Sequence, residues 1–225
     1  MADLMLSANQ ATKSYGDLIA LTPVDIEIPR GQLVALVGHN GSGKSTFLRL
    51  VAGTLDLSGG SIEIDGAPVG SSPARAAVSF VPDDPVLYDD LSVREHLSYV
   101  AALHGVDASA DDVDAIIERF GLLHRADDLP ARFSRGLRQK TSLALGVVRP
   151  FELLLVDEPF VGLDASGKAA LMELLTEAHG AGRTLLVATH ELSYLETVSR
   201  CVALRDGELI YDGASKGLDV LSRVS

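Results

Sequence analysis

The segment from Gly38 to Thr46, GHNGSGKST, constrains this chain more than any other because it fits the pattern G-x-x-x-x-G-K-[ST]. In that pattern backbone N–H groups cradle phosphates, a lysine reaches the β- and γ-phosphates, and a hydroxyl binds Mg²⁺. The residues before it, 32–37, predict a buried strand, and residues 45–52 predict a helix whose N-terminus faces the loop. An ordinary glycine-rich turn is the alternative. The complete pattern between a strand and a helix favours binding of a nucleoside triphosphate. The predicted phosphate-binding residues are Gly38, His39, Asn40, Gly41, Ser42, Gly43, Lys44, Ser45 and Thr46.

Composition limits the class of protein to a globular one. With 225 residues, 47% of them hydrophobic, the chain can bury a full core. Neither a secretory signal nor an apolar run of about 20 residues is found in the sequence, so we expect contact with a membrane only through another protein. The formal net charge of −12 argues against a nucleic-acid surface. A single cysteine, Cys201, is interpreted as a core residue and suits the cytoplasm.

The order of apolar and turn-forming segments predicts an α/β fold. Alternating residues over 4–13 and 24–28 predict an antiparallel layer ahead of the loop, with Tyr15 in the turn between them. Taken alone, Tyr15 is interpreted as a packing residue more readily than as a ligand contact. Further strands are predicted at 61–66, 77–81, 151–156, 183–188, 201–204 and 209–211, and the Asp-Gly pair before the last one predicts a hairpin.

An acidic, helical insert follows the strand at 77–81. Between Asp83 and Asp128 the chain has twelve Asp or Glu residues against three Arg, which is most of its excess charge. Ser92 is a predicted cap for a first helix, and a second helix is predicted after Asp111. Ser134 is a predicted cap for a third helix that runs to residue 148. The basic residues beside Ser134 allow an anion site there, although a plain solvated helix start is the alternative.

Two adjacent carboxylates, Asp157 and Glu158, follow the continuous apolar run at 151–156. Buried carboxylates need a compensating partner, and a Mg²⁺ bound through water to Asp157 would provide one. Glu158 would then orient or deprotonate the attacking water. His190 ends the strand at 183–188, at the same predicted sheet edge, which favours a contact with phosphate. A helix-capping acidic pair and a structural histidine are the alternatives.

Together these segments resemble the ATP-binding cassette family over essentially the whole chain. The specific elements are the loop at 38–46, the strand ending in Asp157-Glu158-Pro159, and Ala188-Thr189-His190. Three weaker signals agree with them: Tyr15 matches the aromatic residue that stacks on adenine, residues 162–164 match the D-loop, and residues 133–137 (FSRGL) occupy the place of the signature, usually LSGGQ.

The resemblance implies a single domain over residues 1–225. Its fold would be a P-loop NTPase core with a mixed central sheet, an N-terminal antiparallel β layer, and an inserted helical subdomain at about 84–147 that bears the signature. It also implies that ATP and Mg²⁺ bind between two cassettes arranged head to tail. Ser134 and Gly136 of one cassette would close the site of the other, Glu158 would act on water, and His190 would contact the γ-phosphate. The implied partners are a second cassette and an integral membrane transporter subunit, with this chain on the cytoplasmic face of the membrane.

Two departures from the family pattern affect these expectations. Asp83 stands where the family places a Mg²⁺-contacting glutamine; an aspartate can still ligate Mg²⁺ but is shorter and charged. Leu137 replaces the last residue of the signature, as in cassettes of drug, polyketide and antibiotic exporters. The resemblance therefore implies an ATPase subunit that drives transport, in the direction of export. The alternatives are a non-transport cassette ATPase, such as one acting in cluster assembly, and a catalytically weak nucleotide-binding regulator.

Overall fold

The computed structural model describes residues 3–215, apart from the side chains of residues 192 and 193. The two ends of the domain expected over 1–225 therefore lie outside the described residues. The strands are β1 (Leu4–Tyr15), β2 (Leu18–Pro29), β3 (Leu33–Val37), β4 (Gly59–Ile64), β5 (Ala67–Pro68), β6 (Val78–Val81), β7 (Leu153–Asp157), β8 (Thr184–Ala188), β9 (Arg200–Arg205) and β10 (Glu208–Ala214). The helices are α1 (Lys44–Val51), α2 (Ser72–Ala77), α3 (Val93–Leu103), α4 (Ala110–Arg119), α5 (Arg135–Val147), α6 (Ala165–Gly180) and α7 (Leu192–Leu195), with 3₁₀ turns η1 (Leu123–Arg125) and η2 (Pro130–Arg132).

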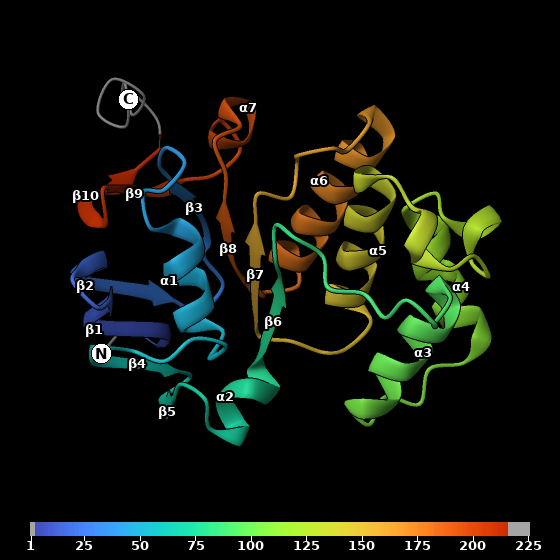
Figure 1. The fold of residues 1–225 in the computed structure, drawn as a ribbon, viewed down its shortest axis with the longest axis horizontal. Coiled ribbons are helices and arrows are strands. Elements are labelled where there is room, and N and C mark those ends of the chain that lie inside the picture. The colour runs from blue at the N-terminus through green and yellow to red at the C-terminus, as the bar shows by residue number, and fades with distance from the viewer. Residues whose placement is uncertain (1–2, 216–225) are drawn as a thin grey trace.

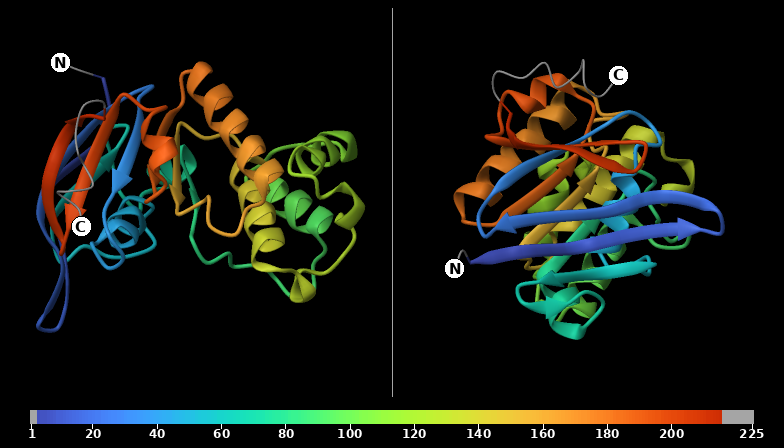
Figure 2. Two further views of the ribbon diagram at one scale, coloured as in Figure 1. Left: turned by 90° about the horizontal axis from the view of Figure 1, so that it is seen from above. Right: turned by 90° about the vertical axis from the view of Figure 1, so that its left-hand side faces the viewer.

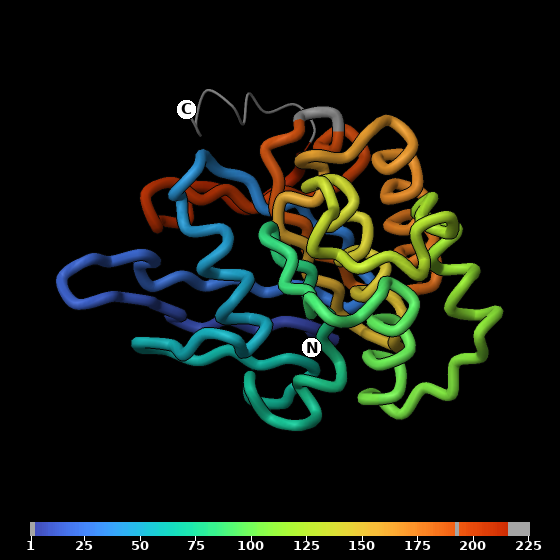
Figure 3. Tube along the Cα trace, turned by 45° about the vertical axis from the view of Figure 1, so that its right-hand side comes forward, coloured from blue at the N-terminus to red at the C-terminus, as the bar shows by residue number. Residues whose placement is uncertain are grey.

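The strands form two sheets, which confirms the predicted fold class. The central sheet has the order β10-β9-β3-β8-β7-β6. Its neighbours pair in parallel except for β10, which is antiparallel to β9, so the sheet is mixed. The second sheet, β2-β1-β4-β5, is antiparallel throughout. The turn between β1 and β2 projects beyond the rest of this sheet (Figure 3).

Helix α1 lies between the two sheets and contacts both of them (Figure 1). Alternate residues of the central strands face opposite ways, as strand geometry requires. Leu155 packs into the core around α1, and Val156 packs into the core on the other face of the sheet, with α5 and α6. Each fully buried large apolar side chain contributes about 1.5–3 kcal/mol. The central strands, buried on both faces, therefore form a rigid support for the loops that follow them.

Helices α3, α4 and α5 lie at the end of the molecule opposite the antiparallel sheet (Figures 1 and 2). Serines cap all three of them. Ser92 and Ser109 form capping boxes with Glu95 and Asp112, and the Ser134 side chain accepts the N–H of Leu137. These caps satisfy backbone donors that the first turn of a helix leaves unpaired. The predicted helix starts at Ser92 and Ser134 are thus confirmed, and α4 begins at Ala110, two residues before the predicted start after Asp111.

Several local details differ from the sequence-based expectation, and strand β2 begins at Leu18 rather than at residue 24. Helix α2 was not predicted. Ser71 caps it and Pro73 lies in its first turn, which together are a helix start signal, but the helix is too short to show a clear apolar periodicity. Strand β1 continues to Tyr15, which makes the turn to β2 tighter than predicted. Strand β7 begins at Leu153 rather than at residue 151. Cys201 lies in β9 with its side chain fully buried, as predicted.

Within residues 3–215, no helix has the length and hydrophobicity needed to cross a lipid bilayer.

The contact between α5 and β6 allows a test of how tightly the helical part packs on the sheet. A Cβ added at Gly146 would lie 2.4 Å from Val81 Cγ2. Gly146→Ala should therefore lower the free energy of unfolding by about 1–3 kcal/mol, because the overlap outweighs the gain in helix propensity. Gly180→Ala, where a Cβ would meet nothing within 4 Å, is the matched control and should be neutral or stabilising. Urea unfolding of both variants measures the difference, and equal stabilities would contradict this packing.

Candidate functional site

The loop from residue 38 to 43 connects β3 to α1 in the conformation that the sequence pattern predicts. Gly43 is the N-cap of α1 and has φ 104°, a left-handed conformation that favours glycine. A Cβ at Gly38 would lie 2.2 Å from Ser42 Oγ and 2.4 Å from the carbonyl oxygen of Leu204. Only glycine fits there without movement of the backbone. The loop therefore turns back on itself at the N-terminus of α1, where N–H groups and the helix dipole favour an anion.

Lys44 provides a buried positive charge at the loop. Its side chain is 6% exposed, and its ammonium group donates to the carbonyl oxygens of Gly38 at 2.7 Å and of His39 at 3.2 Å. The same nitrogen lies 3.3 Å from Glu158 Oε1, which forms an ion pair without hydrogen-bond geometry. Lys44 is thus held between the loop and the end of β7.

Glu158 and His190 come together because β7 and β8 are parallel neighbours. Asp157 pairs in register with Ala188, and the Glu158 N–H donates to the Ala188 carbonyl at 2.9 Å. Beyond the strands, His190 Nδ1 lies 2.9 Å from Glu158 Oε2. Glu158 has φ 45°, which is unusual for a residue with a side chain and is a form of strain that persists where the surrounding structure fixes it. The structure therefore brings three predicted site residues, Lys44, Glu158 and His190, into one contact network.

Asp157 is buried at the end of β7, and its charge is poorly compensated. Burial raises the pKa of its carboxyl group, a hydrogen bond with the Ser45 side chain lowers it, and the charges of Glu158 and Asp83 raise it further. The Oδ1 atom of Asp157 has no hydrogen-bond partner within the described chain. An unpaired carboxylate oxygen beside a serine hydroxyl fits Mg²⁺, which takes oxygen ligands and is often held by one or two carboxylates together with substrate phosphates. No cluster of three or more His, Cys, Asp or Glu residues suited to a metal is found in residues 3–215, so such an ion would need those additional oxygens.

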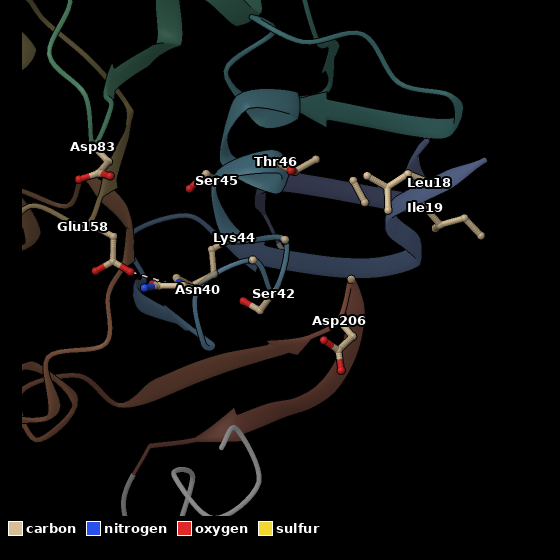
Figure 4. A pocket seen from close by; sticks show the side chains of 14 residues that line it. Leu18, Ile19, Asn40, Ser42, Lys44, Ser45, Thr46, Asp83, Glu158 and Asp206 are labelled. Atoms are coloured by element: carbon tan, nitrogen blue, oxygen red, sulfur yellow. Dashed lines mark ion pairs between the residues drawn. The ribbon is translucent and has the colours of Figure 1, made fainter. Parts of the chain in front are cut away.

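A cavity of about 460 Å³ lies over the loop. Figure 4 shows Asp83 and Glu158 at one side of it, Ser45 and Thr46 in the middle, and Leu18 and Ile19 at the far side. Asp83 and Glu158 thus lie on the side of the cavity opposite Leu18 and Ile19. The predicted residues that line it are Asn40, Gly41, Ser42, Gly43, Lys44, Ser45, Thr46, Asp83 and Glu158.

Several lining residues were not predicted. Leu18 and Ile19 at the start of β2 are 67% and 59% exposed, although they are large and apolar. Asp206 lies in the β9–β10 turn, and its carboxylate is 3.3 Å from His39 Nε2. An isolated apolar pair after a turn and a hairpin aspartate carry no functional signal in a sequence. Only the approach of both hairpins to the loop reveals them.

Tyr15 does not line this cavity among the described residues. It ends β1, is 49% exposed, and has Lys13 Nζ 5.0 Å from its ring centroid. Its contact with adenine therefore stays a prediction. Leu18, which pairs with Tyr15 across the β1–β2 turn, and Ile19 do line the cavity and give it apolar surface.

Ser134 and Gly136 lie apart from the loop of their own chain. Both are at the start of α5, and neither lines the cavity within the part of the chain that the structure describes. A Cβ at Gly136 would lie 2.4 Å from the carbonyl oxygen of Gly162, so the signature segment packs closely on residues 162–164. Asp164 caps α6 and pairs with Lys140 at 2.9 Å; this pair lowers the pKa of Asp164 to about 2. Gly136 is thus packed on residues 162–164, and Ser134 beside it is exposed.

A parallel sheet with a phosphate-binding loop, a buried lysine and an acidic pair at its carboxyl edge defines a nucleotide-binding protein of the P-loop class. Comparisons with known proteins agree with this class. The family profile described as "ABC transporter" matches residues 21–161. The ABC-type transporter ATP-binding protein EcsA of Bacillus subtilis (strain 168) is 32% identical over 91% of this chain and 85% of its own length. The SkfA peptide export ATP-binding protein SkfE of the same organism is 32% identical, over 92% of this chain and 88% of its own.

The fold agrees with solved structures as well. A chain described as the ATP-binding subunit of an ABC transporter superposes with a TM-score of 0.86 at 31% identity, covering 97% of this chain and 92% of that one. The chain therefore belongs to the ABC transporter family. Within that family it is an ATP-binding, ATP-hydrolysing subunit.

Because burial raises the pKa of Asp157, this site residue should lower the free energy of unfolding at neutral pH, and a substitution can test this. A carboxyl group whose pKa is higher in the folded state than in the unfolded state favours folding only at low pH, and that contribution is lost as the pH rises through its folded pKa. Asp157→Asn removes the buried charge and keeps an oxygen that can accept from Ser45. We expect a higher Tm at neutral pH, by roughly 2–4 °C for each 1 kcal/mol gained.

The advantage of Asp157→Asn should shrink as the pH falls through the raised folded pKa, and it should disappear well below the ordinary aspartate pKa of about 3.9, where the wild-type carboxyl group is neutral in both states. Calorimetric Tm values from about pH 2.5 to 8, measured without nucleotide or metal, test this. A variant less stable than the wild type at neutral pH would contradict the assigned cause.

Proposed function

We propose that this chain is the ATPase motor of an export system and drives a separate membrane-spanning subunit. The network of Lys44, Glu158 and His190 at the edge of the central sheet is the observation that carries the chemistry. The similarity to a peptide export ATP-binding protein supports the direction of transport. The alternative functions are those of a non-transport ATPase and of a weakly catalytic regulator, and the experiments below distinguish both from an export ATPase.

Each part of the cavity has a proposed role in binding ATP. The loop N–H groups and Lys44 hold the β- and γ-phosphates, as in other sites of this pattern. The apolar side, with Leu18 and Ile19, receives the base together with Tyr15. Ser45, Asp157 and Asp83 are the residues that would hold Mg²⁺, which would neutralise phosphate charge there.

Glu158 is the proposed base that accepts a proton from the attacking water. Its contact with His190 Nδ1 fixes the direction of its carboxylate, and its ion pair with Lys44 holds it beside the phosphate loop. His190 is 61% exposed on its side chain, so it can turn towards a phosphate oxygen. The side chain of Glu158 is only 12% exposed, which limits the access of solvent to its carboxylate.

A second cassette is the proposed partner that completes the site. Gly136 is packed on residues 162–164, with the exposed Ser134 beside it, rather than over the cavity of its own chain. With Ser134 as the N-cap of α5, its neighbouring N–H groups can bind the γ-phosphate of a nucleotide held by another copy or by a related cassette.

The membrane-spanning partner is proposed to bind in a groove of about 780 Å³ between the central sheet and the helical part. With its membrane partner bound in this groove, the chain would lie on the cytoplasmic face of the membrane, and we propose the helical subdomain boundaries at about residues 84 and 147. Val86, at its rim, is 88% exposed. Acidic residues of the helical part have local roles: Asp112 completes the capping box with Ser109 at the start of α4, and Asp114 pairs with Arg94. Apolar contact, rather than the net charge of this segment, is thus the feature to test.

Hydrolysis is tested with Glu158→Gln. Without its carboxylate the chain should bind ATP but lose about 10²–10⁴-fold in turnover, the usual contribution of a general base. It should also accumulate as an ATP-dependent dimer in size-exclusion chromatography. Lys44→Ala is the control and should fail at the binding step. Equal turnover by the wild type and Glu158→Gln would instead support the regulator.

The docking groove is tested with Val86→Asp. A charge at this exposed apolar position should reduce co-purification of a multi-spanning membrane protein after detergent extraction, because the charge would lose its hydration on docking. ATP binding should be unchanged. Leu129→Asp, at an exposed apolar residue outside the groove, is the matched control. Recovery of only soluble partners with the wild-type chain would favour the non-transport ATPase.

A further inference from the structure

Asp83 and Arg135 form a contact that the proposed catalytic roles do not use. Arg135 Nη2 donates to Asp83 Oδ1 at 3.0 Å. Asp83 follows β6, and Arg135 is the first residue of α5, 52 positions later. The pair therefore joins the edge of the nucleotide cavity to the helix whose N-cap is Ser134.

Asp83 lies where two compartments meet. It lines the cavity over the phosphate loop and also the groove between the central sheet and the helical part. Its carboxylate lies on the same side of the cavity as that of Glu158 (Figure 4), and its negative charge raises the pKa of Asp157. The same carboxylate thus lines the nucleotide cavity and pairs with a cation on α5.

Arg135 is the first residue of α5, so its contacts depend on where the start of this helix lies. Its aliphatic stem lies against Gly162, where an added Cβ would be 3.5 Å from Arg135 Cγ. Its side chain is 61% exposed, and that of Asp83 is 44% exposed. Ion pairs this exposed contribute little free energy and exchange readily. Arg138, one turn along α5, contacts the same segment by donating to the Pro85 carbonyl at 3.0 Å, but it reaches no carboxylate there.

We propose that Asp83 and Arg135 form a latch that links the two half-sites of one chain. Asp83 pairs with Arg135 until a metal–nucleotide complex enters the cavity and takes over its carboxylate. Arg135 is then released, and the start of α5, with Ser134 and Gly136, is free to move towards the nucleotide of a second cassette. This latch rests on the proposed function, because it requires ATP with Mg²⁺ in the cavity.

The test compares ATP affinity with Mg²⁺ and with EDTA. Glu158→Gln serves as the parent so that ATP is not consumed, and equilibrium dialysis is performed at a protein concentration where the parent is monomeric. Arg135→Ala should tighten ATP binding about 2–5-fold with Mg²⁺, the range expected from the loss of an exposed competing ion pair. With EDTA it should bring no gain. Arg135→Lys should behave as the parent does, because it keeps the charge.

Two further variants separate the latch from a general effect on α5. Arg138→Ala removes a neighbouring contact to the same segment and should leave the affinity unchanged. In an Asp83→Asn background, Arg135→Ala should no longer tighten binding. A gain that persists in this background, an equal gain with EDTA, or no gain with Mg²⁺ would overturn the latch. If the parent binds no ATP while remaining folded, the proposed function itself fails; if it binds ATP and Lys44→Ala does not, only the latch is in question.

Discussion

One buried ammonium group, that of Lys44, connects the separate parts of the site. It contacts two loop carbonyls that follow β3 and the Glu158 carboxylate that follows β7. These strands are not sequence neighbours, and they reach the same edge only because the central sheet has the order β3-β8-β7 with all three strands parallel. Carboxyl ends of parallel strands meet at one edge, which is where such folds bind ligands. The chemistry therefore depends on the topology of the sheet.

The same edge concentrates features that oppose folding. Asp157 is buried with one oxygen unpaired, and Glu158 adopts a left-handed backbone conformation. Such conformations cost on the order of 1–3 kcal/mol and persist where neighbouring structure fixes them. Here β7 is fully buried, and the Glu158 N–H is bonded to Ala188. The stable core around the strands thus supports a site that is locally unfavourable, as expected of a residue set retained for binding and catalysis.

The sequence predicted most of the fold because its strongest signals are local. The phosphate loop, the capped starts of α3 and α5 and the Asp-Gly hairpin each depend on neighbouring residues. The cavity-lining residues that the sequence did not predict are brought together by contacts between distant segments of the chain. Leu18 and Ile19 line the cavity only because the β1–β2 hairpin approaches the loop. The sequence also shows an acidic segment from 83 to 128, in which Asp112 and Asp114 are used in a capping box and an ion pair. Charge counts cannot distinguish such local uses from a surface open to a partner.

The environment of Cys201 makes the chain nearly inert to thiol reagents. This cysteine is fully buried in β9, and burial raises the pKa of its thiol, so little of the reactive thiolate is present at neutral pH. It is also the sole cysteine of the sequence. A cysteine introduced on the surface of α5 or of the antiparallel sheet would consequently be labelled selectively with a fluorophore or spin probe. The native protein therefore already provides the background in which movement of the helical part against the sheet can be followed.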